Sequence, residues 1–263
     1  MNFVRTITAY NSATTSENKI HDDATATKFG FSGGLVPGVD DFAYMAHAPV
    51  KLWGREWLSQ GAMRARFLKP VYDGDEATLN AGLGETGKLT LSLSSRNIVC
   101  AEGEARREAA AGEVVIPPAA QQPAPESRPP ASPASLVPGQ VLGYAPEPYT
   151  AERGREHLGW VSEDTTLYDD GAIASPAYML RRANYILAAN VRLGPWIHTE
   201  SDIRLHNLLH DGETLEARAR VADNFETKGH RIVSLDFAIL ASGRLAMSGR
   251  HWAIYEPRQV RGG

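Results

Sequence analysis

Asn18-Lys19-Ile20-His21-Asp22-Asp23 is followed, after a short gap, by the glycine-rich run Gly30-Phe31-Ser32-Gly33-Gly34-Leu35-Val36-Pro37-Gly38. This stretch sets one histidine among polar and acidic side chains, just before a helical pattern. One apolar stripe at helical spacing follows it, formed by Val39, Phe42, Ala43, Ala46 and Val50. The sequence therefore predicts a polar loop that leads into a helix beginning after Pro37-Gly38. Pro49 is expected to kink or end this helix.

Composition limits the classes of protein to consider. The chain has 263 residues, 43% of them hydrophobic, which is enough for one large domain or two small ones. Its net charge of -4 and the absence of a basic patch make nucleic acid an unexpected partner. Cys100 is the single cysteine, so an internal disulfide framework and a cysteine metal cluster are excluded. No signal peptide and no membrane-spanning run are recognised, so we expect a cytoplasmic protein without a membrane partner.

A proline-rich segment divides the chain. Residues 117–138 hold eight of the sixteen prolines and no aromatic residue. Such a segment cannot bury a core and is expected to be an extended or disordered connector. The predicted organisation is an N-terminal domain at 1–112, a linker at 113–140 and a C-terminal domain at 141–263.

The two halves repeat each other at an offset of 138 residues. The shift carries Arg66 to Arg204, Asp73-Gly74 to Asp211-Gly212, and Gly38 to Pro176. Ser175 and Pro176 suit the N-cap and first position of a second helix, which should run to about Asn190. Strand-like segments follow each helix, at 63–67, 77–83 and 89–101, and at 196–205, 214–221, 231–240 and 245–255. The prediction is an α+β protein with two antiparallel sheets, each wrapped around a central helix.

Residues 18–23, with Ala26, Gly30-Phe31 and Leu35–Gly38, resemble the hydratase motif of the MaoC-like family, which includes R-specific enoyl-CoA hydratases and acyl-thioester dehydratases. The resemblance implies a double hotdog fold and a hydratase or dehydratase acting on a 2-enoyl or 3-hydroxyacyl thioester of the CoA type. It makes His21 the acid and base and the Gly38 amide the donor to the thioester oxygen. No metal or redox cofactor is implied, because the CoA or carrier thioester is part of the substrate.

The motif departs from the family pattern at the catalytic aspartate. That aspartate stands five residues before the histidine, where this chain has Ser16. If residues 17–25 form a helical turn, Glu17 shares the face of His21 and could take the place of the missing aspartate. Asn18 would hold the loop, and Ser16 could bind water or substrate. Asp23 matches the motif and is a catalytic candidate, but it is expected on the far side of the turn, where a helix-start role is the more common one.

Further pocket residues are expected beyond the motif. Val36 lies beside the expected oxyanion site, and Tyr44 belongs either to the core or to a tunnel wall. Trp196 and His198 either face the pocket or are a buried tryptophan and a satisfied strand histidine. In the second half the 138-residue shift carries His21 to Gly159, so the motif is expected to be lost there. His206 and His210 would need a third ligand to form a metal site, and none is predicted.

Three other functions fit the same residues. A hotdog thioesterase would aim water at the carbonyl carbon and release free thiol. A non-catalytic acyl-binding or partner subunit would turn over no thioester. A hydro-lyase could instead act on a non-thioester substrate. The expected assembly is a monomeric double hotdog or a homodimer.

Overall fold

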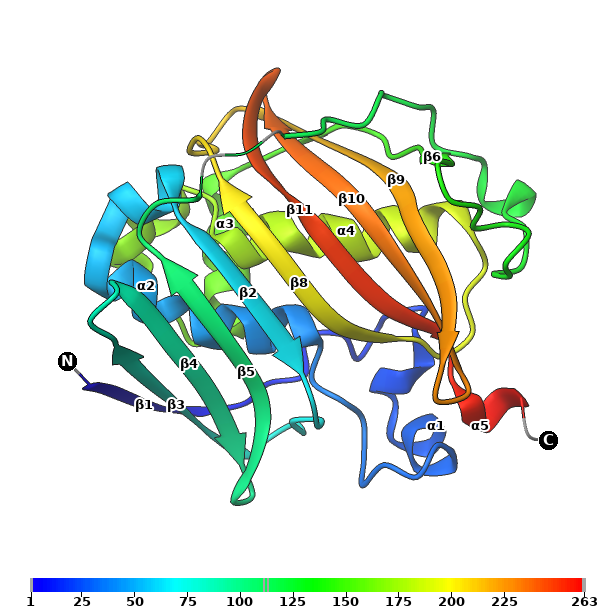
Figure 1. Cartoon of the computed structure of the whole chain (residues 1–263), viewed down its shortest axis with the longest axis horizontal. Coiled ribbons are helices and arrows are strands. Elements are labelled where there is room, and N and C mark those ends of the chain that lie inside the picture. Colours follow the sequence, from blue (N-terminus) through cyan, green and yellow to red (C-terminus); the bar gives the residue numbers. More distant parts are fainter. Residues whose placement is uncertain (1, 111, 113, 262–263) are drawn as a thin grey trace.

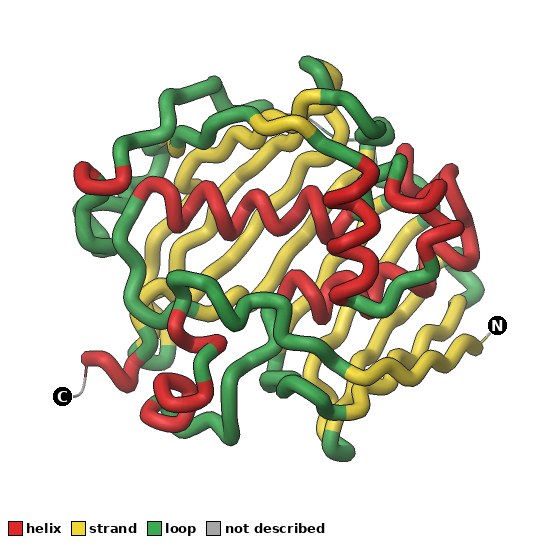
Figure 2. Tube along the Cα trace, turned by 180° about the vertical axis from the view of Figure 1, so that it is seen from behind, coloured by secondary structure: helices red, strands yellow, loops and turns green. Residues whose placement is uncertain are grey.

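Two long helices pack on one face of a single antiparallel sheet (Figures 1 and 2). The computed structural model describes residues 2–110, 112 and 114–261. The helices are η1 (Lys19–His21), α1 (Asp23–Lys28), α2 (Gly38–Gln60), η2 (Pro125–Ser127), α3 (Ala151–Trp160), η3 (Thr165–Gly171), α4 (Pro176–Asn190) and α5 (Arg258–Arg261). The strands of the first half are β1 (Asn2–Thr8), β2 (Ala62–Phe67), β3 (Glu76–Leu83), β4 (Lys88–Ser95) and β5 (Ile98–Arg106). Those of the second half are β6 (Val141–Leu142), β7 (Glu147–Pro148), β8 (Ile197–Leu205), β9 (Thr214–Thr227), β10 (His230–Ala241) and β11 (Arg244–Glu256).

The sheet runs through both halves without a break. Its strand order is β1-β3-β4-β5-β2-β8-β11-β10-β9-β6, with β7 paired to β9. The prediction of two separate sheets is therefore wrong, because β2 pairs with β8 in the middle. That pairing is antiparallel and centred on Arg64 opposite Asp202, residues that stand 138 positions apart. Two residues related by the 138-residue repeat thus lie opposite each other at the centre of the pair, which places a pseudo-two-fold axis between them.

Helix α2 is enclosed on all sides through its first half. Every residue from Val39 to Val50 is buried, so the apolar stripe predicted for this helix is part of a fully enclosed segment. Pro49 lies inside the helix and does not end it, and its backbone angles stay helical. The surrounding core offsets the one hydrogen bond that the proline removes. The non-helical break comes instead at Gly54, whose φ of 60° is accessible to glycine.

Helix α4 begins and ends where the sequence predicts. Ser175 caps it by accepting a hydrogen bond from the Tyr178 amide, and Pro176 occupies the first turn. The segment predicted as one strand at 89–101 is instead the hairpin of β4 and β5. Its turn residues Arg96 and Asn97 both have positive φ, at 50° and 61°. A two-residue turn of this kind reverses the chain between paired strands.

The two central helices meet at a buried ion pair. Asp40 of α2 binds Arg181 of α4, and their side chains are 0% and 7% exposed. Ser12 completes the group, since its Oγ donates to Asp40 Oδ2 at 2.5 Å and accepts from Arg181 Nη2 at 3.1 Å. Each half therefore supplies one charge to the contact between the helices.

The connector between the halves is mostly irregular, with the short helix η2 as its main regular element. Its predicted start at residue 113 lies outside the described residues. The expectation that it buries nothing is wrong at Leu136, which is fully buried in the core. No described helix combines the length and apolar character needed to cross a membrane.

Removing one partner of the buried ion pair should destabilise the fold. Asp40→Ala leaves the Arg181 guanidinium buried without its carboxylate, and we expect a loss of about 3–5 kcal/mol in the free energy of unfolding. Urea denaturation checks this. Glu56→Ala, which breaks the exposed Glu56–Arg107 pair, is the matched control and should change stability by less than about 1 kcal/mol. Equal effects of the two variants would contradict the role given to Asp40.

Candidate active site

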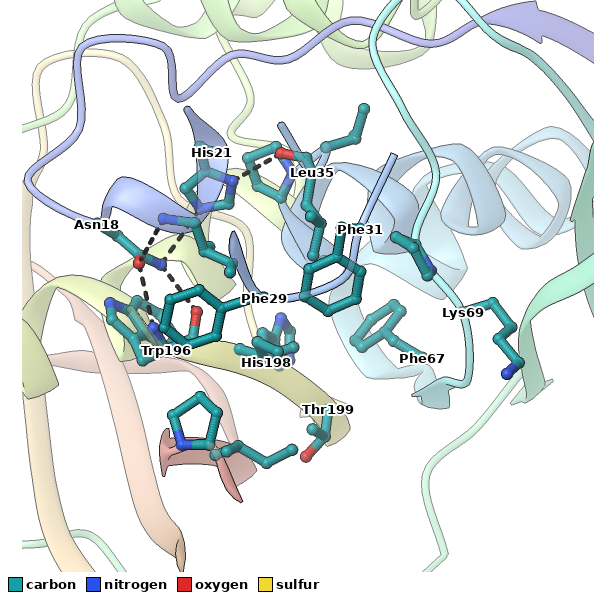
Figure 3. Close-up of a pocket in the computed structure, with 18 of the residues that line it drawn as sticks. Asn18, His21, Phe29, Phe31, Leu35, Phe67, Lys69, Trp196, His198 and Thr199 are labelled. Atoms are coloured by element: carbon teal, nitrogen blue, oxygen red, sulfur yellow. Dashed lines mark hydrogen bonds between the residues drawn. The ribbon is translucent and has the colours of Figure 1, made fainter. Parts of the chain in front are cut away.

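A cavity of about 260 Å³ opens where the two halves meet. The first half supplies η1, the glycine-rich run and the start of α2, while the second half supplies the start of β8. Its walls are mainly aromatic and aliphatic (Figure 3), and they include Phe29, Phe31, Leu35, Phe67, Trp196 and Ile197. An apolar chamber with a few polar groups is typical of a small-molecule site.

His21 lies on the cavity wall with its tautomer fixed. Its Nδ1 lies 2.7 Å from the Leu35 carbonyl oxygen, which can only accept, so Nδ1 carries the proton. The lone pair is therefore on Nε2, which faces the Asn18 side-chain amide at 3.4 Å. Burial lowers the pKa of the His21 imidazole, opposed by the Leu35 carbonyl and by Asp40. A neutral imidazole with an unprotonated Nε2 can act as a base.

Asn18 joins the two halves at this point. Its Nδ2 donates to the Trp196 carbonyl at 2.9 Å, and its Oδ1 accepts from the Trp196 amide at 3.2 Å. The same Oδ1 caps η1 by accepting from the Ile20 amide. The predicted loop-holding role of Asn18 thus extends across the interface between the halves.

The N-terminus of α2 opens into the cavity. Gly38 begins the helix, and its N-cap Pro37 makes no side-chain capping bond. The first N–H groups of a helix have no intrahelical acceptor, so they can bind an anionic or carbonyl oxygen. Val36 also lines the cavity, and its amide is tied to the Val71 carbonyl at 2.9 Å. Gly38 and Val36 therefore both line the cavity, and their roles toward a substrate stay predictions.

The acidic residues of the motif do not join His21. Glu17 precedes the helical turn, which starts only at Lys19, so it does not share the face of His21. Its side chain is 82% exposed and pairs with Arg128, which corrects the proposed His21–Glu17 pair. Asp23 instead accepts from the Gly34 amide at 2.7 Å and fixes the glycine-rich run. Ser16 accepts from the Asn18 amide, which gives it a local structural contact.

The other predicted pocket residues divide into two groups. Trp196 and His198 both line the cavity, and they are 7% and 5% exposed. Tyr44 does not line it, because its hydroxyl accepts from the Tyr10 amide within the core. This bond holds the Tyr44 ring against the segment that follows β1. Its proposed contact with substrate is therefore corrected.

Two further polar residues of the cavity were not singled out from the sequence. Asp41 is 3% exposed, and its Oδ1 has no hydrogen-bond partner among the described residues. Burial and the neighbouring Asp40 raise the pKa of the Asp41 carboxyl well above its usual range. Asn184 of α4 presents a second buried oxygen without a described partner. Asp41 stands three residues after Gly38, so helical spacing could have placed it on the same face.

The corresponding place in the second half is closed. His157 on α3 is 1% exposed, and its Nδ1 lies 3.3 Å from Ser175 Oγ at the start of α4. The space beside it, lined by Ser175 and Tyr168, measures only about 10 Å³. Among the described residues no three His, Cys, Asp or Glu side chains are placed to hold a metal ion. His206 instead contacts Ser248 Oγ at 2.8 Å.

The bridge made by Asn18 should be a large contributor to stability. Asn18→Ala leaves the buried N–H and carbonyl of Trp196 unpaired, and we expect a loss of about 2–4 kcal/mol in the free energy of unfolding. Asn207→Ala removes an exposed side-chain bond to the Leu245 carbonyl and is the control. Thermal and urea denaturation of both variants check the difference, and an equal loss in the two would argue against the bridge.

No family model matches the sequence, and no curated protein matches it significantly. Similar solved structures share its fold over nearly the full length. A protein of Chloroflexus aurantiacus described as a MaoC domain dehydratase has a TM-score of 0.67 at 10% identity, covering 98% of this chain and 95% of that one. RV0216 of Mycobacterium tuberculosis, described as having a double hotdog fold, has a TM-score of 0.66 at 13% identity, with 97% and 95% covered.

A third structure widens the range of activities found on this fold. A protein of Lactobacillus plantarum described as an oleoyl thioesterase has a TM-score of 0.54 at 12% identity, covering 98% of this chain and 96% of that one. These likenesses at low identity concern architecture. The chain has an α+β double hotdog fold, like that of MaoC-like dehydratases.

Proposed function

We propose that the protein is a hydro-lyase that adds water to a 2-enoyl thioester or removes it from a 3-hydroxyacyl thioester. The observation that carries this proposal is the fixed His21 imidazole with its unprotonated Nε2, which lines an apolar cavity together with the N-terminus of α2. Hydration needs a base for water and donors for the enolate-like oxygen, and these two features supply them. The fold shared with MaoC-like dehydratases supports the same reaction class.

The side chains of the cavity can account for every proton that moves in the reaction. His21 Nε2 takes a proton from water as the oxygen attacks carbon 3, and negative charge develops on the thioester oxygen near Gly38. The imidazolium can then return that proton to carbon 2, so one residue serves as base and acid. Asp41 is the second cavity group able to exchange a proton, because its raised pKa favours the protonated acid.

The rim of the cavity favours an anionic carrier on the thioester. Lys69 and Arg258 both line it, and both are exposed at its edge. The Lys69 ammonium points away from the apolar interior (Figure 3). Phosphates of a CoA-type thioester could contact these cations while the acyl group lies among Phe29, Phe31 and Phe67.

Turnover of enoyl-CoA substrates should depend on His21. With a panel of trans-2-enoyl-CoA substrates from short to long, the enoyl-thioester absorbance should fall without release of free thiol. His21→Ala should lower kcat by about 10²–10⁴-fold, since it removes the acid–base group. His210→Ala, at an exposed turn, is the matched control and should keep full activity.

Other outcomes would assign a different activity. Release of thiol by the wild type but not by His21→Ala would indicate a thioesterase. Binding of acyl-CoA without turnover would indicate an acyl-binding subunit. If no enoyl-CoA of the panel is bound or converted, a hydro-lyase acting on a non-thioester substrate would remain as the hypothesis that keeps the same acid–base chemistry.

The pH dependence should report the lowered pKa of His21. Only the neutral imidazole can accept a proton from water, so kcat/KM should be lost as pH falls through that pKa. The midpoint of this acid limb should lie below about 6.5, the ordinary value for histidine. Steady-state rates between pH 4.5 and 8 check this, with tryptophan fluorescence showing that the protein stays folded. A midpoint above 6.5 would contradict the assignment.

A further inference from the structure

His198 brings a polar atom of the second half to the cavity. Its side chain extends from β8 toward the cavity beside Phe67 (Figure 3). The residue is 5% exposed, and Nδ1 has no hydrogen-bond partner within the described part of the chain. A buried polar atom without a partner is costly, so one that lines a ligand-sized cavity indicates a place where a ligand completes its bonding.

The same nitrogen lies against the start of α2. A Cβ built on Gly38 would stand 3.0 Å from His198 Nδ1, so the imidazole lies directly beside the first residue of the helix. The Gly38 N–H belongs to the first turn of α2, whose amides lack intrahelical acceptors. A group from each half therefore meets at one point of the cavity wall.

The neighbours of His198 decide which ring nitrogen carries its proton. Its Nε2 lies 2.8 Å from Ser201 Oγ, and that Oγ lies 3.2 Å from Nδ1 of His251. Ser201 and His251 face each other across β8 and β11, and both are completely buried. The serine has one proton to donate, so this chain of three side chains has two possible directions.

A ligand oxygen would decide between the two directions. His251 Nε2 also has no described partner. If Ser201 donated to His251, the N–H without an acceptor would be at His251 Nε2, deep in the sheet. If His251 Nδ1–H donates to Ser201 and Ser201 donates to His198 Nε2, that N–H is instead at Nδ1 of His198, a residue that lines the cavity. An oxygen bound there accepts from it and leaves only the lone pair of His251 unpaired, and unpaired buried acceptors are more common than unpaired N–H groups. Binding of a carbonyl oxygen therefore favours the direction that gives His198 an N–H at Nδ1.

Both imidazoles remain neutral under ordinary conditions. Burial lowers the pKa of His251 to about 3. Burial and the neighbouring His251 lower the pKa of His198 well below its usual value, opposed by a backbone hydrogen bond with Glu200. A neutral imidazole can donate a hydrogen bond to an oxygen on which charge develops without introducing a full positive charge into the apolar cavity.

We propose that His198 Nδ1–H and the Gly38 N–H together bind the carbonyl oxygen of the thioester, which makes His198 a catalytic residue supplied by the second hotdog. Ser201 and His251 are positioning residues that hold the donating tautomer. This inference rests on the proposed action on acyl thioesters and assigns the second half a direct part in the reaction. Because two donors polarise the carbonyl, loss of one should lower kcat more than it raises KM.

The tautomer can be tested on the free protein. With ¹⁵N-labelled histidine, the ring spectrum should show His198 protonated at Nδ1 and unprotonated at Nε2. Ser201→Ala removes the proton donor to Nε2 and should mix the two tautomers. A wild-type His198 protonated at Nε2, with a bare Nδ1, would overturn the proposal whatever the substrate is.

The contact with substrate can be tested without turnover. Butyryl-CoA labelled with ¹³C at its carbonyl cannot be hydrated, and its carbonyl stretching band should shift to lower frequency on binding to the wild type. His198→Leu should reduce the shift, and with the enoyl-CoA substrate it should lower kcat by about 10²–10³-fold. His198→Asn places an amide N–H near the former Nδ1 and should recover part of both. His206→Leu removes another histidine bonded to a serine, just after the end of β8 and outside the cavity, and is the control.

The outcomes separate the two proposals. If the wild type hydrates enoyl-CoA through His21, and folded His198→Leu keeps both the band shift and kcat within about threefold, the role of His198 is overturned and the hydratase assignment stands. If the wild type neither binds nor converts any thioester, both are overturned. A large loss in His198→Leu with partial recovery in His198→Asn supports the proposal even if His198→Leu is less stable, because the two variants differ in the donor.

Discussion

The pairing of β2 with β8 is the constraint on which the rest of the molecule depends. It joins the five strands of the first half and the six of the second into one sheet, and it is centred on residues 64 and 202. The start of β8 then lies beside the start of α2. Trp196, just before β8, and His198 within it therefore line the cavity together with residues of the first half. Neither half contains the whole cavity wall, so the backbone hydrogen bonds of this pair position the site as well as the sheet.

The buried polar groups are concentrated where the halves meet. Asp40 and Arg181 neutralise each other between the central helices, and Asn18 satisfies the backbone of Trp196. Other polar atoms at the cavity have no described partner, among them Asp41 Oδ1 and Asn184 Oδ1. Such atoms lower stability while the cavity is empty, which is typical of sites where function and stability compete.

Local patterns predicted the helices well and the long-range contacts poorly. The Ser175–Pro176 cap and the apolar stripe after Gly38 depend on neighbours in sequence, so both helix starts were predictable. The junction of β2 with β8 joins residues more than 130 positions apart, and periodicity carries no signal for it. The Glu17 pairing failed because the turn begins at Lys19, two residues later than the assumed start, which leaves Glu17 outside the helical face of His21. Asp41 was not singled out from the sequence, although its spacing from Gly38 could have placed it in the cavity.

The pseudo-two-fold axis through the centre of the β2–β8 pair bears on the origin of the molecule. A single unit with this edge would pair with a second copy of itself, because an antiparallel pair about an axis is self-complementary. Such a dimer would carry two identical sites, each completed by the partner. Once both units lie on one chain, they can diverge independently, and one place has closed around His157 and Tyr168 while the other has kept its cavity. Gene fusion thus permits an asymmetry that a homodimer of identical chains could not encode.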